Sequence, residues 1–176
     1  TLKSLGVGSE TVIRVKGRST LTKIRFFGSR ESLLDRSQIL LQADRGPNTP
    51  LENSISDSLI DSALSNIPDS CALVISDYDK GVISRDGAQT LITTANNQGI
   101  PVIVDPKLTG LEKSRGATVV IFEKRGMSLL SRRIGLDDDE AAKQLLAEYS
   151  WQGILVLGGI HGIHLHQKEH DCIFMP

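Results

Sequence analysis

The stretch that decides the fold runs from Cys71 to Lys107 and reads CALVISDYDKGVISRDGAQTLITTANNQGIPVIVDPK. Its two apolar runs, Ala72–Ile75 and Val102–Val104, are short and rich in β-branched residues, which is typical of buried strands. The segment between them ends at Gly99 and carries small and apolar residues at near-helical spacing, namely Ile83, Gly87, Leu91, Ile92 and Ala95. This order predicts a strand–helix–strand unit, which is normally parallel and right-handed.

Each apolar run ends in a cluster of acidic and lysine residues. The first cluster is SDYDKG at Ser76–Gly81, and the second is DPK at Asp105–Lys107. In open α/β sheets ligands bind outside the carboxyl ends of the strands, so both clusters are predicted at that edge. A lysine there can hold a phosphate, and an aspartate can orient a hydroxyl group or a hydrated Mg²⁺ ion. A single cluster could equally be a polar loop with a helix cap, but two on one edge favour a phosphate-handling site.

The composition excludes several classes of protein. The 176 residues suffice for one α/β domain with a core, and a net charge of −1 marks neither a nucleic-acid surface nor a membrane surface. No apolar run approaches the roughly 20 residues that span a bilayer. Two cysteines are too few for a disulfide framework, which favours the cytoplasm. The first ten residues lack both an initiator methionine and a signal-peptide pattern, so we expect an internal piece of a longer protein.

The remaining chain divides into a β-rich start and an alternating β/α part. Alternation predicts strands at Thr11–Val15 and Thr22–Phe27, joined by a turn, and another at Ile39–Ala43. From residue 51 onward, apolar strands alternate with helical patterns, which predicts a three-layer α/β/α sheet that is mainly parallel. We expect parallel strands near 73–75, 102–104, 119–121 and 154–157 with helices on both faces, helices over 51–67, 126–134 and 137–149, and a final hairpin of 163–166 with 172–175.

Two groups of possible metal ligands have simpler interpretations. The acidic run Asp137–Glu140 suits the positive end of a helix, and consecutive helical residues point in different directions, which disfavours a metal cluster. The histidines of the final hairpin are expected on its solvated outer face; the alternative is a metal site in which His164 and His166 share a face and His170 is the third ligand. Cys71 is expected in the core, and Trp151 as a packing anchor.

Several segments resemble the ribokinase-like (PfkB) sugar kinases, and most closely the heptose-7-phosphate kinase domain of bifunctional ADP-heptose synthases. The similarity covers nearly the whole chain. Its most specific motifs are S-D-Y-x-K-G at residues 76–81 and D-P-K at residues 105–107. Weaker similarity lies in TKIRF (22–26), RGATVV (115–120) and LVLGGIHG (155–162).

The resemblance implies a ribokinase-like fold and the phosphorylation of a sugar phosphate by ATP with Mg²⁺. It implies that residues 1–50 are the remnant of a small β-rich lid, through which two chains pair, and that residues 51–176 are the α/β core. The substrate-binding residues carried over from the motifs are Lys23, Arg25, Asp77, Tyr78 and Lys80. Asp105 and Lys107 match positions on the nucleotide and phosphate side.

Four departures from the family pattern weaken the implied activity. The T-P-N-x-x-E motif is replaced by Ile121–Gly126, the Q-Q-L-L-R segment reads ESLLD at Glu31–Asp35, and the threonine of L-V-T-x-G-x-x-G is Leu157. The G-A-G-D motif, which supplies the catalytic base, would follow Pro176. We therefore expect weak or absent binding of Mg²⁺ and ATP and no turnover by this piece alone. The alternative is a non-catalytic ribokinase-like binding or scaffold module. A dinucleotide-binding domain is disfavoured because no G-x-G-x-x-G follows a strand.

Overall fold

The computed structural model describes residues 2–28, 38–47 and 49–176. It divides into two compact units, one made of Thr1–Thr11 with Leu51–Pro176 and the other of Val12–Pro50. The segment Glu31–Asp35 lies outside the described residues. The interpretation of residues 1–50 as a lid remnant and of residues 51–176 as a core stays a prediction.

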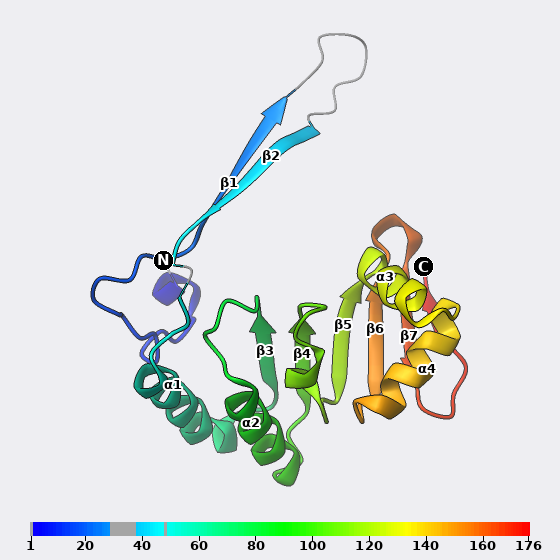
Figure 1. Cartoon of the computed structure of the whole chain (residues 1–176). Helices are drawn as coiled ribbons and strands as arrows, with labels where there is room; N and C mark the ends of the chain where they lie inside the picture. Colours follow the sequence, from blue (N-terminus) through cyan, green and yellow to red (C-terminus); the bar gives the residue numbers. More distant parts are fainter. Residues whose placement is uncertain (1, 29–37, 48) are drawn as a thin grey trace. The chain divides into compact units, whose positions relative to one another are not determined.

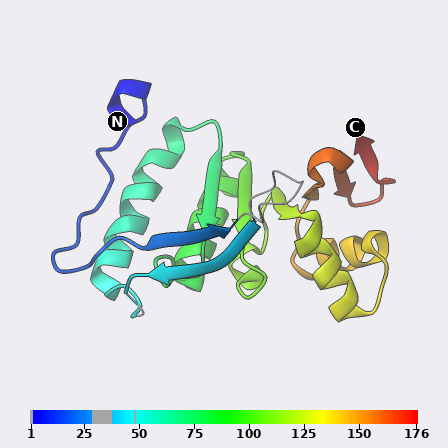
Figure 2. The ribbon, with the colours of Figure 1, turned by 90° about the horizontal axis from the view of Figure 1, so that it is seen from above.

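The larger unit is built on one six-stranded sheet, whose spatial order follows the chain (Figure 1). The first four strands are parallel and the last two antiparallel, which confirms the predicted parallel strands and the final hairpin. The strands are β3 (Leu73–Asp77), β4 (Val102–Pro106), β5 (Val119–Glu123), β6 (Gly153–Leu157), β7 (Ile163–Gln167) and β8 (Ile173–Met175). Figure 2 views this unit from the carboxyl ends of the parallel strands.

The helices begin and end largely where the sequence predicts. Ser84 caps the second helix by accepting a hydrogen bond from the Gly87 amide, and Asp137 caps the last one by accepting from the Glu140 amide. The acidic run at Asp137–Glu140 therefore starts a helix, as expected. The α-helices are α1 (Asn53–Asn66), α2 (Arg85–Asn97), α3 (Lys124–Ile134) and α4 (Asp138–Glu148), and the 3₁₀-helices are η1 (Leu2–Leu5), η2 (Ile67–Asp69), η3 (Leu111–Ser114) and η4 (Gly159–His161).

The hydrophobic core lies on one face of the sheet. Ile75, Val104, Val120 and Ile154 are neighbours in register, and all four are buried under α1–α4 in one cluster with Trp151. Trp151 is fully buried, so its predicted role as a packing anchor is confirmed.

The other face of the sheet has no helix among the described residues. Val74 and Leu157, which lie on it, are 65% and 39% exposed. The prediction of helices on both faces is therefore wrong for this part of the chain, although the sheet itself is as predicted. Apolar strands show that both faces suit burial, but they do not show which segment covers each face. Cys71 is exposed as well, because it precedes β3 at the amino end of the sheet, outside the core.

The smaller unit contains an antiparallel hairpin of β1 (Thr22–Gly28) and β2 (Gln38–Arg45). The predicted strand at Thr11–Val15 is wrong, because that segment has no regular structure. Among the described residues, β1 pairs only with β2, so no strand is paired with Thr11–Val15. Alternating residues make a strand only when a second strand supplies hydrogen bonds.

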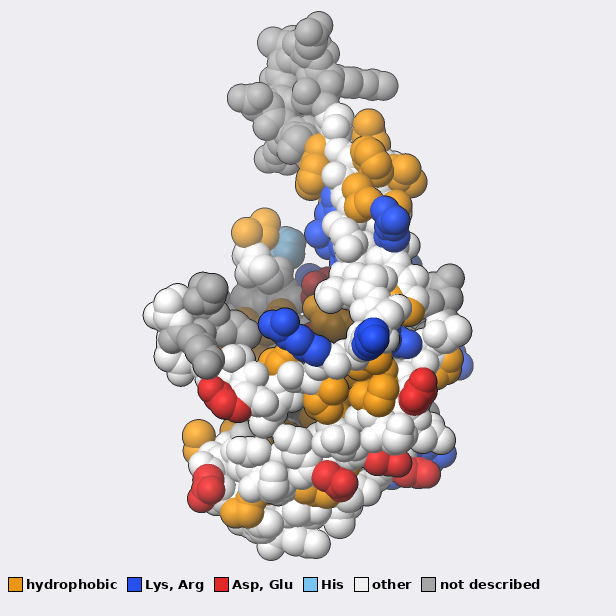
Figure 3. Space-filling model, turned by 90° about the vertical axis from the view of Figure 1, so that its left-hand side faces the viewer, with side chains coloured by type: hydrophobic (Ala, Val, Ile, Leu, Met, Phe, Trp, Pro, Cys, Tyr) orange, Lys and Arg blue, Asp and Glu red, His pale blue; other side chains and the backbone are white. Residues whose placement is uncertain are grey.

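The hairpin has one polar and one apolar face. Lys23 and Arg25 stand opposite Asp44 and Gln42 in register, so all four lie on the polar face. The adjacent pairs Ile24 with Ala43 and Phe26 with Leu41 form the apolar face. Ile24, Phe26 and Leu41 are exposed, and hydrophobic side chains are visible on the hairpin in Figure 3.

Candidate functional site

The loop after β3 is fixed at both ends. At its start the Asp79 amide donates a hydrogen bond of 2.9 Å to the Asp77 carboxylate, and Asp79 takes a left-handed conformation with φ of 54°. Aspartate tolerates this conformation better than most residues because its short side chain bonds locally to the backbone. At its end the Ser56 hydroxyl donates to the Val82 carbonyl at 3.0 Å, which joins the loop to α1. The SDYDKG segment is thus a built turn on the carboxyl edge of the sheet.

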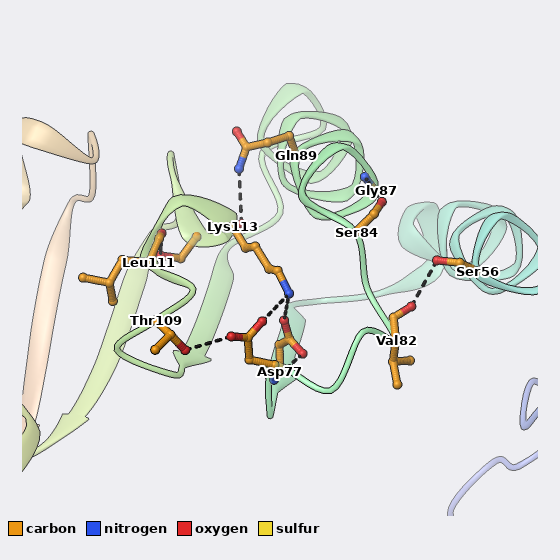
Figure 4. A network of polar contacts seen from close by, with 11 residues as sticks. Ser56, Asp77, Val82, Ser84, Gly87, Gln89, Thr109, Leu111 and Lys113 are labelled. Atoms are coloured by element: carbon orange, nitrogen blue, oxygen red, sulfur yellow. Dashed lines mark hydrogen bonds and ion pairs between the residues drawn. The ribbon is translucent and has the colours of Figure 1, made fainter. Parts of the chain in front are cut away.

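A lysine distant in the sequence joins the two aspartates of this loop (Figure 4). The Lys113 ammonium lies 2.7 Å from Asp77 Oδ2 and 3.0 Å from Asp79 Oδ1, and the Thr109 hydroxyl donates to Asp79 Oδ2 at 2.8 Å. Lys113 is positioned by η3, which is tied to α2 because the Gln89 side-chain amide donates to the Lys113 carbonyl. We call Asp77, Asp79, Thr109 and Lys113 the Asp77–Lys113 cluster.

Contacts within the cluster favour the charged forms of Lys113 and Asp79. Burial alone would lower the pKa of Lys113, but the hydrogen bonds to Asp77 and Asp79 outweigh burial and raise it. The hydrogen bond from Thr109, followed by that from Lys113, lowers the pKa of Asp79. Asp77 is 9% exposed and Lys113 19%, whereas Asp79 is 36% exposed and offers its carboxylate to solvent. The cluster therefore presents fixed carboxylate oxygens that can accept hydrogen bonds from ligand hydroxyls.

Two further predicted site residues meet beside the cluster. Lys107 follows β4, and its ammonium group lies 4.9 Å from the centre of the Tyr78 ring. Such a contact holds a flexible lysine over the sheet edge. Lys80 is exposed in the loop after β3, and its ammonium makes no hydrogen bond or ion pair with the residues that the structure describes. The structure thus gathers Asp77, Tyr78, Lys80 and Lys107 at neighbouring strand ends, as the motifs predict.

The other predicted residues do not join this group. Asp105 pairs in register with Ser76, while Asp77 pairs with Pro106. Because successive side chains of a strand point to opposite faces, Asp105 lies on the uncovered face, away from the Asp77 carboxylate. Asp105 thus lies at the predicted edge of the sheet but does not meet Asp77, and its place on the nucleotide side stays a prediction.

Lys23 and Arg25 lie in the other unit. The Arg25 guanidinium donates to the Gln42 side chain at 3.1 Å, within the polar face of the hairpin. Their part in the same site as Asp77 stays a prediction.

Sequence reasoning missed Lys113 and Thr109. No motif marks them, and Lys113 lies 36 residues after Asp77. The one available signal was physical: a strand-end aspartate that becomes buried needs a cationic or hydrogen-bonding partner. That rule indicates that a partner exists but not which residue supplies it.

Two of the four departures from the family pattern lie at strand ends. Leu157 ends β6 beside Glu123, which ends β5, so an apolar side chain stands where the family has a threonine. Helix α3 then begins at Lys124 with no acidic residue in its first turn. The amino end of a helix disfavours a bound cation. Within the described chain, the only carboxylate at this end of α3 is that of Glu123, so few ligands are available there for the Mg²⁺ of a nucleotide.

Comparison with known proteins identifies the fold and the relatives. No protein-family model matches the chain. The bifunctional protein HldE of Koribacter versatilis is 32% identical over 165 residues, which are 92% of this chain and 32% of HldE. HldE of Shewanella piezotolerans is 30% identical over 99% of this chain and 35% of its own length. The chain is homologous to one part of HldE. It spans about a third of the length of these relatives.

Solved structures agree with this homology. A fructokinase with bound ATP from Xylella fastidiosa superposes with a TM-score of 0.66 at 16% identity, over 99% of this chain and 54% of its own. An Arabidopsis thaliana ribokinase complexed with ribose and ATP gives 0.62 at 15% identity, over 97% of this chain and 52% of its own. The chain therefore has the ribokinase-like fold. None of its described helices combines the length and apolar character needed to cross a bilayer.

Proposed function

We propose that the chain is the core of a sugar kinase module of the heptose 7-phosphate kinase type, which phosphorylates a sugar phosphate with Mg-ATP in the cytoplasm. The observation that carries the proposal is the placement of the S-D-Y-x-K-G and D-P-K motifs at adjacent carboxyl strand ends. There, the loop after β3 is bonded into a fixed turn and Lys107 packs on Tyr78. The homology to HldE over 92% of the chain supports the same conclusion.

The roles follow from the charges at this edge. The carboxylates of Asp77 and Asp79 accept hydrogen bonds from sugar hydroxyls, and Lys113 fixes both carboxylates before the sugar arrives. Lys80 and Lys107 are cations suited to the phosphate of the substrate or nucleotide. By resemblance, Lys23 and Arg25 contact the sugar phosphate from the hairpin, and Asp105 lies on the nucleotide side.

The residues present fit Mg-ATP only in part. In such kinases Mg²⁺ neutralises the charge of the transferred phosphoryl group. Here Lys107 and Asp105 remain at the strand ends, but Leu157 replaces a threonine and the T-P-N-x-x-E motif is absent. We therefore propose that nucleotide binding is weak. Since residues 1–176 contain no G-A-G-D motif, we also propose that these residues bind sugar phosphate without measurable turnover.

A non-catalytic module that binds a sugar phosphate or a partner is the second candidate. The observation that favours it is the apolar Leu157 at the strand end where nucleotide-binding kinases of this family have a hydroxyl group. In both readings the exposed apolar face of the hairpin is the proposed contact between two copies of the chain.

Calorimetry with heptose 7-phosphate and a coupled ADP-release assay test the proposal together. We expect binding of the sugar phosphate, and a loss of about 10–100-fold in affinity in Lys80→Ala, because hydrogen bonds to charged groups contribute about 1.5–3 kcal/mol. Lys143→Ala is the matched control, since Lys143 is an exposed lysine on α4, and its affinity should not change. Absence of binding would overturn the site. Turnover that disappears in Asp77→Asn would overturn the proposed inactivity.

A further inference from the structure

Four metal-binding side chains gather where the final hairpin meets α4. His164 and His166 lie on β7 opposite Val156 and Ile154, so both point to the helix-covered face of the sheet. His166 is only 7% exposed, so the expectation of a solvated histidine is wrong for this residue, whereas His161 and His170 are exposed. The register of β7 with β8 continues to place Cys172 opposite His166, and Asp139 approaches from the first turn of α4.

His166 faces Cys172 with Nε2 and Asp139 with Nδ1, and only one of these two nitrogens can bind a single ion. The Cys172 sulfur lies 3.7 Å from His164 Nδ1 and 3.9 Å from His166 Nε2, and His166 Nδ1 lies 3.4 Å from Asp139 Oδ1. One ligand atom each from Asp139, His166 and Cys172 lie within 4.8 Å of one another. Zn–S and Zn–N bonds of about 2.3 and 2.0 Å in a tetrahedron place neighbouring ligand atoms about 3.5 Å apart.

We propose that Asp139, His166 and Cys172 bind a divalent transition metal of the zinc type, each through one donor atom. The donor set decides the class of ion. A thiolate with imidazole and carboxylate suits Zn²⁺, whereas Mg²⁺ and Ca²⁺ prefer oxygen ligands alone. His170, the third ligand that the sequence suggested, is an exposed turn residue outside the group.

The metal has a structural role in this position. Strand β8 has only three residues, all exposed, and forms an edge of the sheet. A metal bound through Cys172 and His166 ties this short strand to its neighbour, and Asp139 ties both to α4. The site is remote in sequence from the SDYDKG and DPK motifs, and it does not depend on the proposed sugar kinase function.

Cobalt substitution tests the site. The 176-residue chain is reduced, stripped of metal with a chelator and titrated with Co²⁺, followed by competition with Zn²⁺. We expect one equivalent to bind with visible ligand-field bands and a near-ultraviolet sulfur-to-cobalt charge-transfer band, both removed by Zn²⁺. The protein has one further cysteine, so Cys71→Ser is the matched control and should keep the charge-transfer band, whereas Cys172→Ser should lose it.

The remaining variants separate the metal site from a hydrogen-bonded thiol. Removal of groups that only orient a metal ligand typically costs about 10–100-fold in metal affinity, so His166→Gln should lose more than about 100-fold and Asp139→Asn at least about 10-fold. His161→Gln, on an exposed histidine, should change nothing. Circular dichroism checks that each variant is folded. No charge-transfer band in the folded wild type, or an equal loss in Cys71→Ser, would overturn the proposal.

Discussion

Replacing Lys113 by methionine tests whether the Asp77–Lys113 cluster is an electrostatic unit. The variant keeps most of the side-chain volume and removes the ammonium that lies 2.7 Å from Asp77 and 3.0 Å from Asp79. Asp77, at 9% exposure, then has no ion-pair partner among the residues that the structure describes. We expect the larger unit to lose stability because a poorly solvated charge is left without its partner.

The burial of the pair sets the size of the effect. Breaking a fully buried ion pair costs about 3–5 kcal/mol, and exposed pairs contribute about 0–1 kcal/mol. With Lys113 19% exposed, the pair lies between these limits, and we expect a loss of about 2 kcal/mol. With a urea dependence of about 2 kcal/mol per molar, the unfolding midpoint falls by about 1 M. Adding Asp77→Asn to Lys113→Met should restore part of the loss, since no unpaired charge remains.

Urea unfolding followed by tryptophan fluorescence measures this loss. Trp151 is the single tryptophan, it is fully buried, and its indole donates to the Ser114 carbonyl at 2.8 Å, next to Lys113. Arg85→Met is the matched control, because the Arg85–Glu112 pair is 3.3 Å apart but 64% and 44% exposed, and it should cost less than about 0.5 kcal/mol. Equal losses in Lys113→Met and Arg85→Met would refute the reasoning.

Three other predictions concern pH, backbone and association. The stability that Lys113→Met removes should be greatest between pH 3.8 and 10.5, the ordinary pKa values of aspartate and lysine. The Asp79 contribution is lost as the pH falls through the lowered pKa of Asp79, and the Lys113 contribution is lost as the pH rises through the raised pKa of Lys113. A pH series of urea titrations measures both losses. Gly162→Ala should destabilise the final hairpin by more than about 2 kcal/mol, because φ is +75° and an added Cβ would meet the Met175 carbonyl oxygen, whereas Gly99→Ala, at +70° in open space, should cost about 1 kcal/mol in the same titration. Leu41→Lys should abolish the proposed pairing of chains through the apolar hairpin face, and light scattering that shows the same mass for variant and wild type would contradict it.

The sequence by itself determined the parallel sheet and the edge that carries the site. Short β-branched runs separated by helical spacing leave few arrangements other than right-handed crossovers between parallel strands. The same alternation places both strand-end clusters at one edge, so Asp77, Lys80 and Lys107 were predicted there from local pattern, whereas Tyr78 was named only by the resemblance to the heptose kinases. These features depend on residues close together in the chain, where periodicity is informative.

Only the tertiary structure decided which side chains meet. Asp77 and Asp105 end adjacent strands, yet the one-residue offset in their register sends them to opposite faces of the sheet. Lys113 and Thr109 reach the site through a 3₁₀-helix that carries no motif. Cys172 approaches His166 from the residue before β8 and Asp139 approaches it from a helix, and this proximity depends on packing between separate elements. Pairwise contacts of this kind are set by register and packing, which the spacing of residues along one chain does not encode.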